Sequence, residues 1–128
     1  MPAGSGGSVG TNPQRFLHNY HWGSGAEVDL DAAATPESLG AAVATGRVRR
    51  IREITVRHAG SGNTVITLGV NLGDANEEIR LTFDVPAQTT RVWSSEDGRS
   101  FSAGEQPEVQ TSNVTGGHSY VTAAGIEA

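Results

Sequence analysis

The sequence predicts a mostly β protein: an antiparallel β-sandwich, jelly-roll or immunoglobulin-like, with an extended N-terminal arm and one short helix. Three observations support this class. Residues 52–85 hold three stretches of alternating polarity, shorter strand-like stretches follow Pro86, and the chain begins with a Gly/Ser-rich segment. We therefore expect a tail at 1–14, an arm at 15–46 and a β-sandwich domain at 47–128. Alternation with period two is typical of strands that bury one face.

The three alternating stretches predict a meander in which each strand turns one apolar face inward. Turn-rich segments at 60–63 and 73–76 separate the strands, and Pro86 ends the third. The side chains that we expect to face inward are Ile54, Val56 and His58, then Ile66, Leu68, Val70 and Leu72, then Ile79, Leu81, Phe83 and Val85.

Shorter strands are expected over residues 90–94, 108–112 and 118–125, separated by glycine-rich turns. Their side chains are mainly Thr, Ser, Ala and Gly, which bury little apolar surface. The sequence therefore predicts a thin core that gains stability from neighbouring subunits.

The first 14 residues are rich in Gly and Ser and predict a flexible tail. Within the arm, residues 36–45 carry signals of a short helix. Thr35 is a good N-cap, Pro36 suits the first helical position, and Gly46 is placed to end the helix. Leu39 and Val43 would then share one face of that helix.

Composition limits the possible functions. The chain has 128 residues, a net charge of −5 and a pI near 5.2, which argue against a general nucleic-acid binder. All nine basic residues are Arg, and no cysteine is present, so disulfides and thiolate chemistry are excluded. No apolar run approaches the roughly 20 residues that span a bilayer. The first residues lack the basic and apolar regions of a secretory signal, so we expect assembly in the cytoplasm.

Two groups of residues in and after the arm are candidate interface residues. Aromatic and large apolar side chains dominate binding energy at protein interfaces, and arginines can pair with an acidic neighbour. A phosphate-binding strip is the alternative for the arginines. The candidates are Phe16, Leu17, Tyr20 and Trp22, followed by Arg47, Arg49 and Arg50.

The evidence for other kinds of site is weaker. His18 and His21 form an H-x-x-H pair without a third ligand at a diagnostic spacing, so metal binding stays open and an interface role is favoured. Trp93 and Tyr120 are a possible ligand face for a sugar. Because no nucleophile, base and orienting group can be assembled from the sequence, we expect neither an enzyme nor a cofactor.

Residues 51–128 resemble small β-sandwich proteins encoded among the structural genes of tailed bacteriophages. Four segments carry the resemblance: I-T-V and T-V-I-T-L-G-V within 54–70, V-P-A at 85–87, F-S-A-G-E at 101–105 with V-Q-T-S at 109–112, and Y-V-T-A-A-G-I-E at 120–127. The N-terminal arm has no counterpart in that pattern.

This resemblance implies a non-enzymatic virion component, either a minor tail or tail-tip protein or a capsid decoration protein. Its partners would be other virion proteins and further copies of itself, with a trimer as the expected oligomer and with neither nucleic acid nor membrane bound. The arm would dock on neighbouring subunits. The alternative from a different class is a carbohydrate-binding module for adhesion to a host surface.

Overall fold

The computed structural model describes residues 20–128, which form nine strands. The tail at 1–14 and the predicted anchors Phe16 and Leu17 lie outside the described residues. The strands are β1 (His21–Gly23), β2 (Val28–Leu30), β3 (Glu37–Ser38), β4 (Val48–His58), β5 (Thr64–Val70), β6 (Glu78–Val85), β7 (Thr89–Ser102), β8 (Glu108–Thr111) and β9 (Ser119–Glu127).

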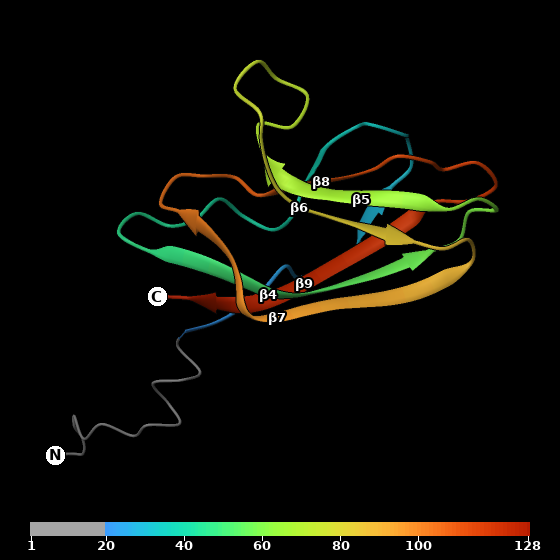
Figure 1. Ribbon diagram of the computed structural model, residues 1–128. Helices are drawn as coiled ribbons and strands as arrows, with labels where there is room; N and C mark the ends of the chain where they lie inside the picture. Colours follow the sequence, from blue (N-terminus) through green and yellow to red (C-terminus); the bar gives the residue numbers. More distant parts are fainter. Residues whose placement is uncertain (1–19) are drawn as a thin grey trace, which may run out of the picture.

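The nine strands form two antiparallel sheets that lie one over the other (Figure 1). One sheet has the order β1-β9-β4-β7, and β2 pairs with β9 beside β1. The other has the order β3-β8-β5-β6. The mostly β, two-sheet class predicted from the alternation is therefore confirmed, and the arrangement is sandwich-like.

A single apolar core fills the space between the sheets. Ile54 and Val56 of β4 and Ile66 and Leu68 of β5 are all fully buried in this core. Each strand presents alternate side chains to this core, as period two requires. The inward faces predicted for β4 and β5 are confirmed, including the burial of His58 at the end of β4.

The predicted helix at 36–45 is wrong, because the segment holds the short strand β3 and irregular chain that bonds to the residues before β8. The backbone N–H of Leu39 donates to the carbonyl of Pro107, and that of Val43 donates to the carbonyl of Glu105. Leu39 and Val43 are both buried, at 0% and 3% exposure. Long-range pairing with burial of two aliphatic side chains outweighs the local capping signals, which contribute only about 1 kcal/mol each.

The described part of the predicted arm is built into the two sheets. β1 and β2 lie along β9, and β3 lies along β8. Leu30, Leu39 and Val43 join the apolar core, so the core is larger than the meander alone predicted. The interpretation of residues 20–46 as an arm separate from the sandwich is therefore corrected.

A β-bulge in β6 explains the one inward residue of the meander that is exposed. Leu68 pairs with Leu81, but its neighbour Gly69 pairs with Ile79, so Arg80 is the extra residue. The shift turns Ile79 outward, where it is 56% exposed. Gly69 permits this bend because a Cβ at that position would overlap with the carbonyl oxygen of Glu78.

A second irregularity lies opposite the middle of β4. The register of β4 shifts between Ile51 and Glu53 against both of its neighbours. Gly125 of β9 packs so closely here that a Cβ would overlap with the carbonyl oxygen of Arg50. Over residues 20–128, no helix is long and apolar enough to cross a membrane.

Candidate functional site

A buried chain of polar side chains links the two sheets. His58 of β4 contacts the hydroxyl of Ser119 of β9 through Nδ1, at 2.8 Å. Ser119 Oγ lies 3.1 Å from Thr111 Oγ1 of β8, which lies 2.5 Å from Thr64 Oγ1 of β5. All four side chains are at most 2% exposed. Four strands from both sheets therefore share one hydrogen-bonded network.

Its backbone partners fix the direction of these hydrogen bonds. His58 Nε2 lies 2.8 Å from the carbonyl oxygen of Gly62, which can only accept, so Nε2 carries a proton. In a neutral imidazole Nδ1 then accepts from the Ser119 hydroxyl. At the other end, Thr64 Oγ1 accepts from the backbone N–H groups of Ser112 and Asn113. Each member of the network has a partner, as buried polar groups require.

A hydrogen-bonded Ser–His pair is also the arrangement that activates a serine nucleophile. Here the serine hydroxyl is fully buried and the histidine is 2% exposed. A substrate carbonyl would need to approach Ser119 Oγ closely, and burial leaves no room for it. The arrangement therefore suits the joining of strands, and its chemistry is that of a structural network.

Only one member of this network, His58, was predicted from the sequence to face inward. Alternation in β4 predicted that His58 faces inward, but Ser119 lies 61 positions away in a stretch of small residues without a distinctive pattern. The signal that points to a polar network is an inward histidine at the end of a strand, because a buried imidazole needs hydrogen-bond partners.

Arg49, predicted as an interface residue, is instead buried within the chain at 2% exposure. Its Nε donates to Glu127 at 2.7 Å, and its Nη1 donates to the carbonyl of Ala41 at 2.6 Å. The guanidinium carbon also lies 4.3 Å from the ring centroid of Trp22. Arg49 thus fastens β1, the segment after β3 and the end of β9 to one another. Its donors are used inside this chain.

Arg80 forms a second arginine cluster, partly buried, at the β6 bulge. Its guanidinium donates two parallel hydrogen bonds of 2.8 Å to the Glu105 carboxylate, and further bonds to Glu78 and to the carbonyl of Ser100. The hydrogen bond to Glu105 raises the pKa of Arg80 above its usual value despite partial burial. The hydrogen bond from Arg80 in turn lowers the pKa of Glu105 below its usual value.

Arginine stacking on aromatic rings recurs throughout the described chain. Five arginines place their guanidinium carbons within 6 Å of a ring centroid, where a cation is attracted to the ring face. The pairs are Arg49 with Trp22, Arg57 with Tyr120, Arg80 with Phe101, Arg91 with Phe83 and Arg99 with Trp93. Planar guanidinium groups suit such stacking better than ammonium groups, which gives the all-arginine composition a structural use.

The other predicted interface residues that the structure describes lie at one end of the sheet, where β1 and the start of β4 flank the end of β9. Tyr20 is half-buried at the start of the described chain, and Trp22 packs partly against the core. Arg47 is exposed, and Arg50 is half-buried on the outer face of β4. Arg47 donates to the carbonyl of Glu127 at 3.4 Å, and Arg50 pairs with Ile126, so these residues are neighbours within the chain, and a role for them at an interface stays a prediction.

Trp93 and Tyr120 do not form a shared ligand face. Trp93 pairs with the inward Ile54 and packs partly against the core, whereas Tyr120 pairs with the exposed Arg57 on the opposite face of the sheet. The Arg57 guanidinium also covers the Tyr120 ring at 4.1 Å. A sugar would have to displace that guanidinium to stack on this face of the ring.

Metal ligands do not assemble around the histidine of the H-x-x-H pair that the structure describes. His21 is exposed in β1, and His18 lies outside the described residues. Over residues 20–128, no group of three His, Cys, Asp or Glu side chains is placed to hold a metal ion. An interface role for His18 and His21, favoured over metal binding, therefore stays a prediction.

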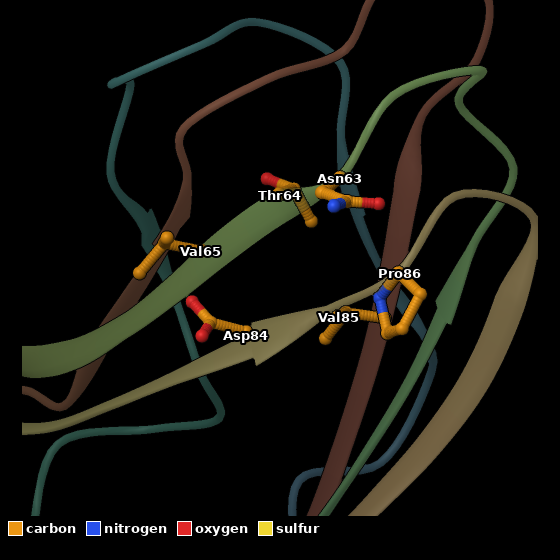
Figure 2. A pocket seen from close by; sticks show the side chains of 6 residues that line it. All are labelled: Asn63, Thr64, Val65, Asp84, Val85 and Pro86. Carbon is orange, nitrogen blue, oxygen red and sulfur yellow. The ribbon is translucent and has the colours of Figure 1, made fainter.

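A shallow hollow of about 260 Å³ lies where β5 begins and β6 ends (Figure 2). Its lining is mixed, with aliphatic, amide, hydroxyl and carboxylate groups. The lining residues are Asn63, Thr64, Val65, Asp84, Val85 and Pro86. A mixed, shallow lining fits a side chain of a partner protein better than an enclosed small molecule.

No protein-family model matches the chain, and no curated protein is significantly similar to it. The interpretation of function therefore depends on the geometry described above.

Proposed function

We propose that the protein is a non-enzymatic structural component of a bacteriophage virion, either a minor tail or tail-tip protein or a capsid decoration protein. Its jelly-roll or immunoglobulin-like sandwich is a rigid block, and its N-terminal residues 1–19 dock on neighbouring subunits. The virion setting comes from the resemblance carried by the four segments between residues 54 and 127. The structural role has separate support in the geometry.

The observation that carries the structural role is the internal use of the polar side chains. The Ser119–His58 pair is buried, and Arg49 and Arg80 hold strands together. These are side chains that an active site would present to a substrate. Among residues 20–128, the surface instead exposes four large aliphatic residues, Val48, Val65, Ile79 and Val92. Such a distribution favours a rigid module that acts through its surface.

The free edges of the sheets are also protected. β1, β2 and β3 are only two or three residues long, and short edge strands discourage pairing with another chain. On the other side, arginine side chains bond to backbone carbonyls across the β6–β7 seam, from Arg80 to Ser100 and from Arg99 to Arg80. Neighbours are therefore expected to bind through side-chain surfaces and through residues 1–19 rather than by strand addition.

The carbohydrate-binding alternative has less support, since Trp93 and Tyr120 lie on opposite faces of one sheet. The proposal is tested by isolating particles from the source culture on a density gradient and quantifying this protein by mass spectrometry. A fixed copy number per particle is expected. A few copies indicate the tail and hundreds indicate the capsid, while absence from the particle band would refute the proposal.

A further inference from the structure

We propose that the hollow between β5 and β6 binds residues Arg15 to Leu17 of a second copy of this chain. This inference deepens the proposed function, on which it rests, by naming the surface that receives the N-terminal segment. The occupant is the Arg-Phe-Leu tripeptide, with Arg15 beside Asp84 and the two apolar side chains against the aliphatic part of the hollow.

The hollow combines an acidic and an apolar side. Val65 of β5 pairs directly with Asp84 of β6, so both side chains lie on the outer face of the sheet. Figure 2 shows them on neighbouring strands, with Asn63 and Pro86 at the strand ends. Val65 is 37% exposed, and Pro86 is exposed as well. An apolar side chain that covers them would remove this surface from water.

The negative charge of Asp84 favours the segment around Arg15 as the occupant of the hollow. Asp84 is exposed, and its carboxylate forms no ion pair with any of residues 20–128. Among residues 1–19, Arg15 is the one arginine, and no Asp or Glu is present. Two large apolar residues, Phe16 and Leu17, follow it directly. The segment therefore supplies a cation next to apolar groups, and the hollow supplies the complementary anion next to apolar groups.

The length of chain between Arg15 and His21 indicates that the occupant comes from a second copy. Arg15 is six residues from His21, which β1 places beside Ile126, so Arg15 lies within about 21 Å of that point at about 3.5 Å per residue. The hollow lies near Ser119, because Thr64 is joined to Ser119 through Thr111. Ser119 is seven residues from Ile126 along β9, or about 23 Å at about 3.3 Å per residue. The hollow also lies on the other sheet, about 10 Å away across the core and roughly perpendicular to β9, so about 25 Å separates it from Ile126. This exceeds the reach of about 21 Å, so the segment that fills the hollow comes from a second copy.

Disulfide trapping tests this contact in the full-length chain, which has no cysteine of its own. Gln14→Cys marks the segment without altering Arg15. Thr82→Cys marks the rim, since Thr82 is exposed and lies two residues from Asp84 on the same face of β6. The matched control is Thr90→Cys, an exposed threonine on the other sheet.

Each single variant is mixed with the Gln14→Cys protein under mild oxidation, so that any mixed disulfide joins two chains. We expect about tenfold more Gln14–Thr82 dimer than Gln14–Thr90 dimer, since docking raises the local thiol concentration into the millimolar range. Equal yields at the two threonines would overturn the inference. Efficient closure within one chain of the Gln14→Cys/Thr82→Cys double variant, without mixed dimers, would overturn the assignment to a second copy.

Charge reversal tests the recognition itself. Asp84→Arg in the Thr82→Cys protein should lower the yield of mixed dimer about fivefold, the effect of one exposed ion pair. Arg15→Asp in the Gln14→Cys protein should then restore it. Loss without restoration would contradict an Arg15–Asp84 contact, since a paired reversal recreates the attraction.

The same variants separate this inference from the proposed function. If the protein bands with particles while Thr82 and Thr90 trap equally, the docking site is refuted and the virion role stands. If Thr82 traps preferentially while the protein is absent from particles, the contact stands as self-association and the virion role is refuted.

Discussion

The Arg80–Glu105 contact gives a direct test of how arginine is used in this fold, through the substitution Arg80→Lys. Lysine keeps the charge but cannot donate two parallel hydrogen bonds to one carboxylate, and its ammonium group stacks less well on an aromatic ring. In the structure Arg80 donates to both Glu105 oxygens at 2.8 Å and lies 4.8 Å from the Phe101 ring centroid. The substitution therefore removes the two parallel hydrogen bonds and the ring stacking but keeps the positive charge.

The expected loss in free energy of unfolding depends on which of the arginine's hydrogen bonds a lysine can still make. A hydrogen bond to a charged group contributes about 1.5–3 kcal/mol when it is shielded from water. The Arg80 side chain is 20% exposed and that of Glu105 is 28% exposed, so the lower part of that range applies. The bond to Glu78 adds little, since that side chain is 63% exposed. With one bond lost and another retained, we expect Arg80→Lys to cost about 1–2 kcal/mol in free energy of unfolding.

Urea unfolding at pH 7, followed by tryptophan fluorescence, measures this difference. Arg52→Lys is the matched control, because Arg52 is exposed in the β4 irregularity and should change stability by at most about 0.5 kcal/mol. A lower midpoint for Arg80→Lys at an unchanged slope is expected. If Arg80→Lys and Arg52→Lys unfold at the same urea concentration, the two-pronged contact contributes nothing that lysine lacks, and the reasoning is wrong.

Three further predictions concern acid stability, the buried network and close packing. The pKa of Glu105 is lowered in the folded state, so the contribution of its carboxylate to folding stability is present above about pH 4.3 and is lost as the pH falls through the folded pKa. Glu105→Gln should therefore lower the free energy of unfolding at pH 7 and reduce the further decrease of that free energy in acid. Parallel curves of stability against pH for variant and parent would contradict this. Ser119→Ala should cost about 1–3 kcal/mol in urea unfolding by leaving the buried Nδ1 of His58 without a donor, and an unchanged midpoint would count against the network. Gly125→Ala should cost about 1–3 kcal/mol because its Cβ overlaps with a carbonyl oxygen of β4, whereas a wild-type melting temperature would show that the strands separate freely there.

The sequence predicted the strands whose alternation is uninterrupted. β4 and β5 bury the side chains expected of them, since period two fixes the inward face once one residue is placed. Ile79 departs from this rule because the extra residue Arg80 shifts its register, and a single bulge is not visible in the pattern of apolar residues.

The segment from Thr35 to Gly46 shows why local signals failed. N-cap, proline and glycine sit at the positions of a helix, yet Leu39 and Val43 contribute more by entering the core beside the chain before β8. That pairing joins positions more than 60 residues apart, so only the assembled sheets reveal it.

The candidate site was even less accessible from sequence. Arg49 appeared within a run of arginines, as an exposed strip would, but the register of β4 turns it inward onto Trp22 and Glu127. Trp93 and Tyr120 lie on two strands of one sheet, and the alternation of side chains along these strands places them on opposite faces. Contacts between distant strands depend on register, which one sequence does not specify.

We propose that this sandwich is a virion component held in place by residues 1–19. The decisive experiment follows the incorporation of a variant lacking residues 2–19, produced together with the full-length chain during particle assembly. We expect the shortened protein to unfold at nearly the same urea concentration as the parent, since the described core uses residues from Trp22 onward, and to be missing from purified particles. Incorporation of both forms in equal amounts would contradict it.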